Sequence, residues 1–215
     1  MADSPRINAC LSYSGVDTVL IQVGRRKTQY HVHHHMLCQI SSFFKTALES
    51  SFKEAIERVV SLPGEREKVV DRFVQWIYHE KVPDCETSPR GTEDARFDYE
   101  HRNCALYVFA DKYGVPDLKR YSIRNLIQII SKSGAPRRST VRRTYNHTVA
   151  SSGLRRLICD WCAWRIRSND LDRDRYRALL TEVPEFSADL VGALSRHWER
   201  RSKPKLDGLR ASAYM

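Results

Sequence analysis

Four histidines lie close together in residues 31–35, with the residue type and spacing of metal ligands. On an extended strand, His31, His33 and His35 would point to the same side, and imidazole is a common zinc ligand. The chain is expected to turn at His34, however, so the alternation stops there, and no fourth ligand follows nearby. A His-rich tract alone is only compositional evidence. We therefore predict neither a metal site nor a cofactor.

A second pattern with chemical potential is the Cys-x-x-Cys pair of Cys159 and Cys162. In redox proteins such a pair begins a helix after a strand, and the helix N-terminus lowers the thiol pKa. Here the pair falls in the middle of a predicted helix, arginines precede it, and no second pair completes a tetrahedral zinc site. We interpret both residues as buried core cysteines. The sequence also lacks a Gly-rich phosphate loop and a nucleophile elbow, so we do not expect an enzyme.

Positive charge is concentrated in the second part of the chain. Residues 133–215 carry 17 Lys/Arg and 9 Asp/Glu, a net charge of +8, whereas residues 1–132 carry 19 and 17, a net charge of +2. Such a basic segment can attract phosphates, acidic proteins or anionic lipid, but it is also consistent with a solvated helix surface. No nucleic-acid-binding motif accompanies the charge. A nucleic-acid-associated regulatory protein is therefore the alternative hypothesis, and salt-dependent binding would test it. The arginines concerned are Arg137, Arg138, Arg142, Arg143, Arg155 and Arg156.

The compartment is indicated by what the sequence lacks. No run of about 18 apolar residues could span a membrane, and the first residues do not have the pattern of a signal peptide. Six cysteines are scattered without a disulfide-like framework. We expect an intracellular protein, in the cytoplasm or the nucleus, that does not enter a membrane.

The elements that must position these residues alternate short strands with helices. Strands are predicted at residues 17–23, around Tyr30 and at residues 58–62. A short helix is predicted at residues 36–40, and a second helix begins at Ser41 or Ser42, since serine hydroxyls can cap it. Three further helices are expected. The first spans residues 65–78, the second ends at Gly114, and the third begins at Pro116. This order indicates an α+β fold.

The domain organisation follows from shifts in composition. We predict a flexible N-terminus at residues 1–14, a domain at residues 15–132 with an exposed loop at 82–99, and a flexible basic tail at residues 201–215. Between them, residues 133–200 form a C-terminal helical extension that begins with a hinge at 133–136. Its helices are expected to run from Ser151 or Ser152 to Arg167, and over residues 185–198. They are too short to make a large separate core, so we expect them to dock on the helical end of the first domain.

Several motifs in the right order resemble those of the BTB/POZ domain. They are Val-His-His-His-Met-Leu-Cys (32–38), Ser-Ser-Phe-Phe (41–44) and Phe-Lys-Glu (52–54), supported by residues 17–19, 106–113 and 115–118. The resemblance is to the stand-alone BTB proteins of filamentous fungi. It implies a BTB/POZ fold: a small sheet of short strands covered by helical hairpins, with a C-terminal helical extension. The family usually has Lys or Arg where this chain has His34. It gives His33 a structural role, as a partly buried imidazole bonded to the backbone.

The resemblance also implies a function, that of a protein–protein interaction module. Phe52 and Glu54 match the hydrophobic-x-Glu motif that adaptor members present to a cullin-type scaffold of a ubiquitin ligase. A three-residue pattern occurs often by chance, so the alternative is that Phe52 packs against its own domain. Met36 and Leu37 could supply a surface for homodimers. Because the residues before position 17 are polar, we expect a monomer or a weak dimer.

Overall fold

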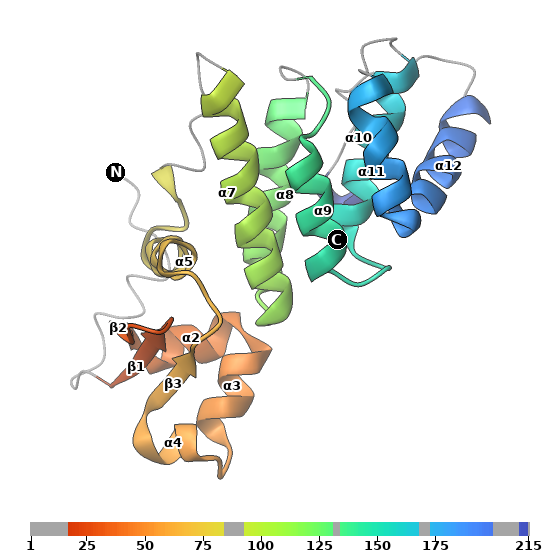
Figure 1. Ribbon diagram of the computed structural model, residues 1–215. Coiled ribbons are helices and arrows are strands. Elements are labelled where there is room, and N and C mark those ends of the chain that lie inside the picture. Colours follow the sequence, from red (N-terminus) through yellow and green to blue (C-terminus); the bar gives the residue numbers. More distant parts are fainter. Residues whose placement is uncertain (1–16, 84–92, 131–133, 168–172, 200–210, 215) are drawn as a thin grey trace. The chain divides into compact units, whose positions relative to one another are not determined.

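The structure of the protein is a computed structural model, and it describes residues 17–83, 93–130, 134–167, 173–199 and 211–214 (Figure 1). The chain divides into two compact units. Unit 1 contains residues 1–86 and 109–118, and unit 2 contains residues 87–108 and 119–215. The division crosses helices α7 (Glu93–Lys112) and α8 (Pro116–Ile130), so each of these helices belongs partly to both units.

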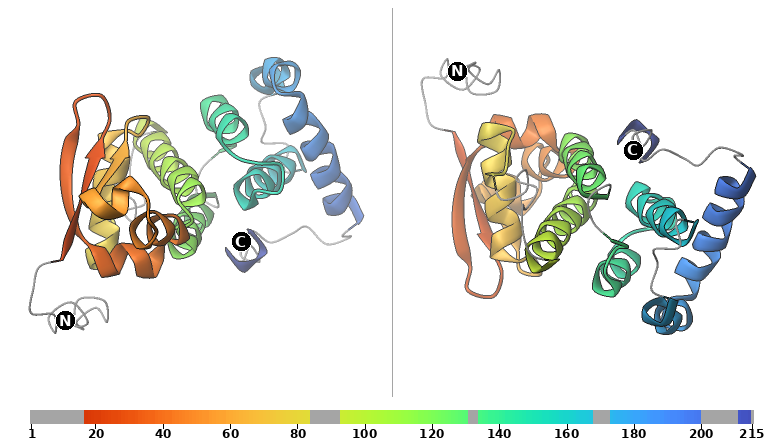
Figure 2. Two further views of the ribbon diagram at one scale, coloured as in Figure 1. Left: turned by 90° about the horizontal axis from the view of Figure 1, so that it is seen from below. Right: turned by 90° about the horizontal axis from the view of Figure 1, so that it is seen from above.

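Unit 1 is built on a three-stranded sheet with the order β2-β1-β3. Strand β1 (Thr18–Val23) pairs antiparallel with β2 (Thr28–His33) and parallel with β3 (Val59–Leu62). Helices α2 (His34–Ile40), α3 (Ser42–Glu49) and α4 (Lys53–Glu57) separate β2 from β3, and α5 (Glu67–His79) follows β3. Figure 2 shows β1 and β2 at the edge of unit 1, with α2, α3 and α5 on one side of them only. The sequence therefore predicted an α+β fold with a small, helix-covered sheet correctly.

The core of unit 1 lies between the sheet and these helices. Val19, Ile21 and Val23 alternate along β1 and are fully buried, as expected of a strand with one covered face. Four aromatic rings fill the space against α3 and α5: Phe44 stacks on Phe73 at 5.8 Å and on Tyr113 at 5.9 Å, and Phe109 lies 4.9 Å from Phe73. Phe44 itself is completely buried.

Unit 2 is helical over its described residues. It adds α9 (Arg138–His147), α10 (Gly153–Arg167), α11 (Arg173–Glu182), α12 (Pro184–Glu199) and the 3₁₀ turn η2 (Ala211–Tyr214) to parts of α7 and α8. A single hydrophobic cluster joins side chains of all these elements. Its largest fully buried members include Tyr99, Tyr107, Trp161 and Phe186. Residues of α7 and α8 thus share one core with the C-terminal helices, and the division of the chain differs from the boundary we predicted at residue 132.

Three further expectations need correction. Residues 93–99 were expected in an exposed loop, but they are the first turns of α7, and Tyr99 is 1% exposed because its ring lies in the core of unit 2. Residues 211–214 were expected in a flexible tail, but they form η2 with Tyr214 buried. The segment after the hinge was not assigned a helix, yet it forms α9, whose Val141 and Tyr145 are buried. The predicted flexible N-terminus lies outside the described residues.

Candidate functional site

The two residues of the hydrophobic-x-Glu motif lie where α3 passes into α4. Phe52 is the N-cap residue of α4 and keeps an extended backbone, with φ −72° and ψ 161°. Its carbonyl accepts a hydrogen bond from the amide of Ala55 at 3.1 Å, which begins the helix. The Phe52 side chain is 57% exposed, and Glu54, in the first turn, is half-buried. More than half of the Phe52 surface is therefore left uncovered by its own domain.

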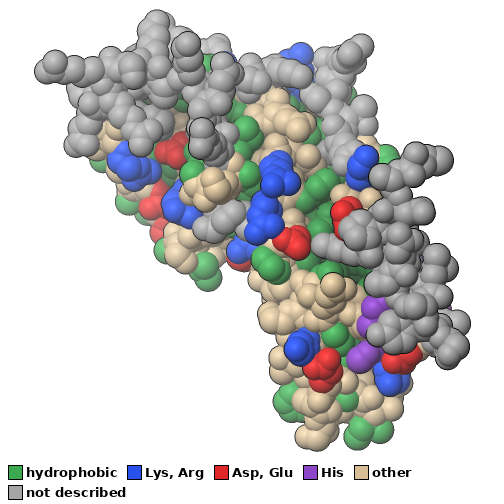
Figure 3. All heavy atoms as spheres, turned by 180° about the vertical axis from the view of Figure 1, so that it is seen from behind, with side chains coloured by type: hydrophobic (Ala, Val, Ile, Leu, Met, Phe, Trp, Pro, Cys, Tyr) green, Lys and Arg blue, Asp and Glu red, His purple; other side chains and the backbone are tan. Residues whose placement is uncertain are grey.

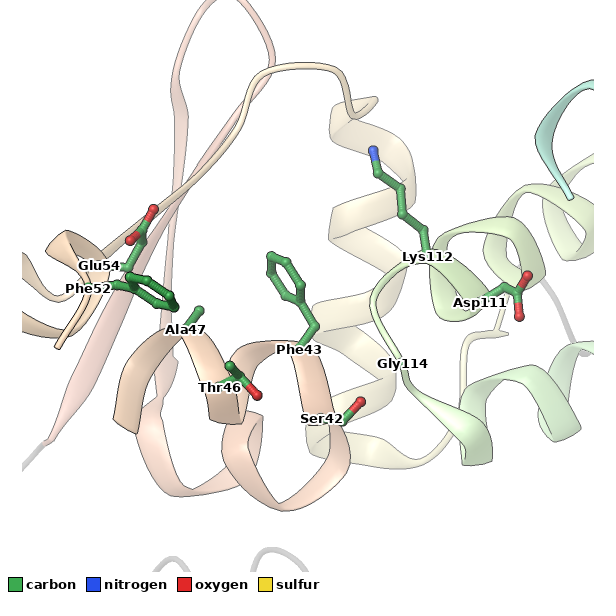
Figure 4. Close-up of a pocket in the computed structure, with 9 residues that line it drawn as sticks. All are labelled: Ser42, Phe43, Thr46, Ala47, Phe52, Glu54, Asp111, Lys112 and Gly114. Atoms are coloured by element: carbon green, nitrogen blue, oxygen red, sulfur yellow. The ribbon is translucent and has the colours of Figure 1, made fainter. Parts of the chain in front are cut away.

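Phe52 and Glu54 line an open surface pocket with a volume of about 730 Å³. Figure 4 shows Phe52 and Glu54 on one side of this pocket, Lys112 and Asp111 on the other side, and Phe43 rising between them from α3. The remaining lining residues are Ser42, Thr46, Ala47 and Gly114.

The floor of the pocket is fixed by contacts between α3 and the turn that joins α7 to α8. The amide of Ser42 donates to the carbonyl of Gly114 at 3.3 Å, and the hydroxyl of Ser41 donates to the carbonyl of Tyr113 at 2.6 Å. Gly114 has φ +60°, a left-handed conformation that disfavours side chains. A Cβ at this position would also collide with the Ser42 hydroxyl. Glycine therefore allows the turn to lie directly against α3.

Lys112, one of the charged residues of the pocket, is held by a specific partner. Lys112 donates to Glu65 at 2.6 Å, and this hydrogen bond raises the pKa of the Lys112 ammonium group. Tyr113 donates to the same carboxylate at 2.9 Å, and burial raises the pKa of its phenol to about 12. Both groups stay protonated at neutral pH, and the ammonium group of Lys112 forms an ion pair with Glu65.

Two large apolar side chains that line this pocket remain exposed, Phe43 by 40% and Phe52 by 57%. Exposed apolar side chains that gather at a pocket mark surfaces at which proteins bind other molecules. Motif reasoning found Phe52 and Glu54, but it missed Phe43, Asp111 and Lys112, which the fold brings from two other elements.

Met36 and Leu37 were predicted as a partner surface, and the structure corrects this. Met36 is 2% exposed and Leu37 is fully buried, because α2 turns both side chains into the core of unit 1. Neither side chain is available on the described surface.

The histidine tract lies at the end of β2 and the start of α2. His33 is half-buried, and its Nδ1 lies 2.8 Å from the hydroxyl of Tyr78, so its partner is a side chain on α5 rather than the backbone. His34 contacts Asp17, with 3.7 Å from Nδ1 to Oδ2, and its Nε2 lies 3.6 Å from the sulfur of Cys38. Among the described residues, no group of three or more acidic, histidine and cysteine side chains could hold a metal ion. The contacts of His33 and His34 connect β2, α2 and α5.

Cys159 and Cys162 are fully buried in α10, as the sequence indicated. The sulfur of Cys159 lies 3.1 Å from the hydroxyl of Tyr145, which in turn donates to Asp189 at 2.8 Å. Burial raises the pKa of Cys159 to about 12 and that of Cys162 well above its usual value. Both thiols are therefore protonated at neutral pH and packed in the core, whereas a reactive cysteine pair has an accessible thiol with a lowered pKa.

Several arginines of the basic segment are engaged within unit 2. Arg155 is 6% exposed, donates to the carbonyls of Tyr145 and Thr148, and pairs with Glu185. Arg142 pairs with Glu182. On the face shown in Figure 3, described Lys and Arg side chains are dispersed among acidic and apolar ones rather than gathered in one patch. These arginines stabilise the helical unit by contacts within the chain.

Comparison with known proteins gives one family. The family model of the BTB/POZ domain matches residues 12–129. No curated protein matches the chain. Within the described part of the chain, none of the helices has the length and apolar character needed to cross a bilayer.

Proposed function

The chain belongs to the BTB/POZ domain family, a family of protein-interaction modules, and on that premise we propose that it binds a cullin-type scaffold through Phe52 and Glu54. In this role it would be a substrate adaptor of a ubiquitin ligase, which acts inside the cell. The function is binding rather than catalysis. Residues of the C-terminal helices would then be available to hold a substrate.

The observation that carries the proposal is the exposure of Phe52 beside the pocket. An aromatic side chain that is 57% exposed contributes little to its own core, whereas its burial against a partner stabilises a complex. Fully burying such a side chain is worth about 1.5–3 kcal/mol. Glu54 lies two residues later at the same pocket, where it can accept a hydrogen bond from a partner.

Isothermal titration of the full chain with a purified cullin scaffold tests the proposal. Truncation of an interface anchor typically costs 2 kcal/mol or more, about thirtyfold in affinity. We expect Phe52→Ala to lose at least about thirtyfold, and the double variant Phe52→Ala with Glu54→Lys to show no measurable binding. Circular dichroism should be unchanged, because neither side chain fills the core.

Ile56→Ala is the matched control. Ile56 lies on α4 and is 79% exposed, but it does not line the pocket. Its truncation removes a similar amount of exposed apolar surface, and we expect less than about a threefold change in affinity. Wild-type binding by the double variant would show that the cullin contact lies elsewhere. Failure of the wild-type chain to bind would make the adaptor role wrong.

A further inference from the structure

The 3₁₀ turn η2 lies against α10 in unit 2, far from the pocket residues in sequence. In a 3₁₀ turn, side chains three residues apart lie on the same side. Ala211 and Tyr214 accordingly both pack on the hydrophobic cluster, with Tyr214 only 4% exposed, whereas Ser212 and Ala213 are exposed. The turn therefore docks through two residues, one small and one aromatic.

The surface that receives this turn has a steric and a polar element. Gly153 and Asp160 are seven residues apart on α10, which is about two helical turns, so they lie on the same face. Any side chain at Gly153 would overlap the carbonyl group of Tyr214. At the other end, the hydroxyl of Tyr214 donates to Asp160 at 3.0 Å. We call this surface, defined by Gly153 and Asp160, the α10 slot.

The α10 slot is held by elements other than the turn. Asp160 also pairs with Arg196 of α12, at 3.6 Å. Asp160 therefore has a partner on α12 in addition to Tyr214 of the turn. Elsewhere along α10, Leu157, Ile158 and Trp161 are buried in the core of unit 2. Burial and the nearby Asp160 raise the pKa of Tyr214, so its hydroxyl keeps the proton that it donates.

We propose that the α10 slot is a binding site for a short peptide segment with a small residue three positions before a tyrosine, and that residues 211–214 occupy it as an intramolecular competitor. A partner segment of the same chemistry binds after the turn leaves. An attached competitor acts at an effective concentration near millimolar, so a free peptide binds the intact chain weakly. The proposal does not depend on the cullin contact.

The test uses the full chain and a fluorescently labelled peptide with the sequence of residues 206–215. In the Tyr214→Ala chain the intramolecular competitor loses its anchor, and we expect saturable binding of the peptide by fluorescence anisotropy. The wild-type chain should bind the peptide at least about tenfold more weakly. A peptide with phenylalanine in place of the tyrosine should bind the Tyr214→Ala chain about fivefold more weakly, because it lacks one hydrogen bond.

Two further variants locate the site. Gly153→Ala, added to Tyr214→Ala, should abolish peptide binding through the steric overlap. Asp160→Ala, also added to Tyr214→Ala, should weaken binding of the tyrosine peptide to the level of the phenylalanine peptide. This second variant tests the site even if the Gly153→Ala variant does not fold. Absence of saturable binding to the Tyr214→Ala chain would overturn the proposal. Equal binding by the wild-type chain, the Tyr214→Ala chain and the chain with both Tyr214→Ala and Asp160→Ala would also overturn it.

Discussion

Neighbouring residues of the same type have opposite environments at several points of this chain. Phe44 is completely buried, whereas Phe43 is 40% exposed and lines the pocket. Because one helical step rotates the side chain by about 100°, only one of two adjacent phenylalanines can face the core. Phe44 therefore stabilises the fold, and Phe43 is available for binding.

This difference predicts the stability of two matched variants. Phe44→Ala should lower the free energy of unfolding by about 3–5 kcal/mol, because it leaves a cavity among the rings of Phe73 and Tyr113. Phe43→Ala should lower it by about 1 kcal/mol, since much of that ring is already in water. Urea denaturation followed by circular dichroism measures both. Equal losses would mean that α3 is rotated from the orientation described.

Thiol chemistry gives a second prediction at the residue scale. Burial raises the pKa of Cys104, Cys159 and Cys162, and it raises that of the less buried Cys38 as well. Access and thiolate fraction both favour Cys38. At pH 8 we expect iodoacetamide to modify Cys38 at least about tenfold faster than the three buried cysteines. Peptide mapping by mass spectrometry measures these rates, with Cys38→Ser as the control. Rapid modification of Cys159 would contradict a closed core around α10.

At the scale of elements, a single serine joins two helices that form the pocket. The hydroxyl of Ser41 accepts from the amide of Phe44 at 3.1 Å, which caps α3, and it donates to the carbonyl of Tyr113 at the end of α7. Ser42, one residue later, is exposed. The position of α3 relative to the α7–α8 turn therefore depends on Ser41.

Replacing each of these two serines by alanine distinguishes the effect of the Ser41 hydrogen bonds from the effect of removing any serine hydroxyl at this position of the chain. Ser41→Ala should cost about 2 kcal/mol, because it removes the cap and leaves the buried Tyr113 carbonyl without this partner. Ser42→Ala should change stability by less than about 0.5 kcal/mol. Thermal unfolding by differential scanning calorimetry checks both values. If Ser42→Ala lowered the stability by a similar amount, the hydrogen bonds of the Ser41 hydroxyl would not be the cause of the loss.

The helices with a clear apolar period could be predicted from the sequence, and the others could not. Apolar spacing located α3, α5, α10 and α12 to within a few residues. In α9, by contrast, β-branched residues and three arginines obscure the period, and its helix depends on the packing of Val141 and Tyr145. Motif spacing likewise supplied Phe52 and Glu54. It could not supply Lys112, which reaches the pocket only through the tertiary fold.

At the scale of the molecule, several arginines of the basic segment form ion pairs and hydrogen bonds within the chain. Arg155 is buried and donates to two backbone carbonyls, while Glu185 balances its charge. The pairs Arg142–Glu182 and Arg196–Asp160 similarly connect helices of unit 2. Arginine suits such positions because its planar group donates several hydrogen bonds at once. These three arginines of the basic segment therefore contribute to the packing of the helices of unit 2.

Arg155 and its neighbour Arg156 test this interpretation. Arg155→Ala leaves the Tyr145 and Thr148 carbonyls without these donors and should cost about 3 kcal/mol. Arg156 is exposed, and Arg156→Ala should change stability by less than about 0.5 kcal/mol. Both variants lower the net charge equally, so a difference in chemical denaturation isolates the structural role. Equal stability of the two variants would contradict it.

The passage of α7 and α8 through both units has a consequence for the order of folding during synthesis. Domains generally fold from the N-terminus as the chain leaves the ribosome. Unit 1 has all its residues once position 118 has emerged. The buried side chains of Tyr99 and Tyr107, however, belong to a hydrophobic cluster whose members on α10 and α12 are translated later. We expect a nascent chain arrested near residue 130 to expose these apolar faces and to bind chaperones until α12 is complete.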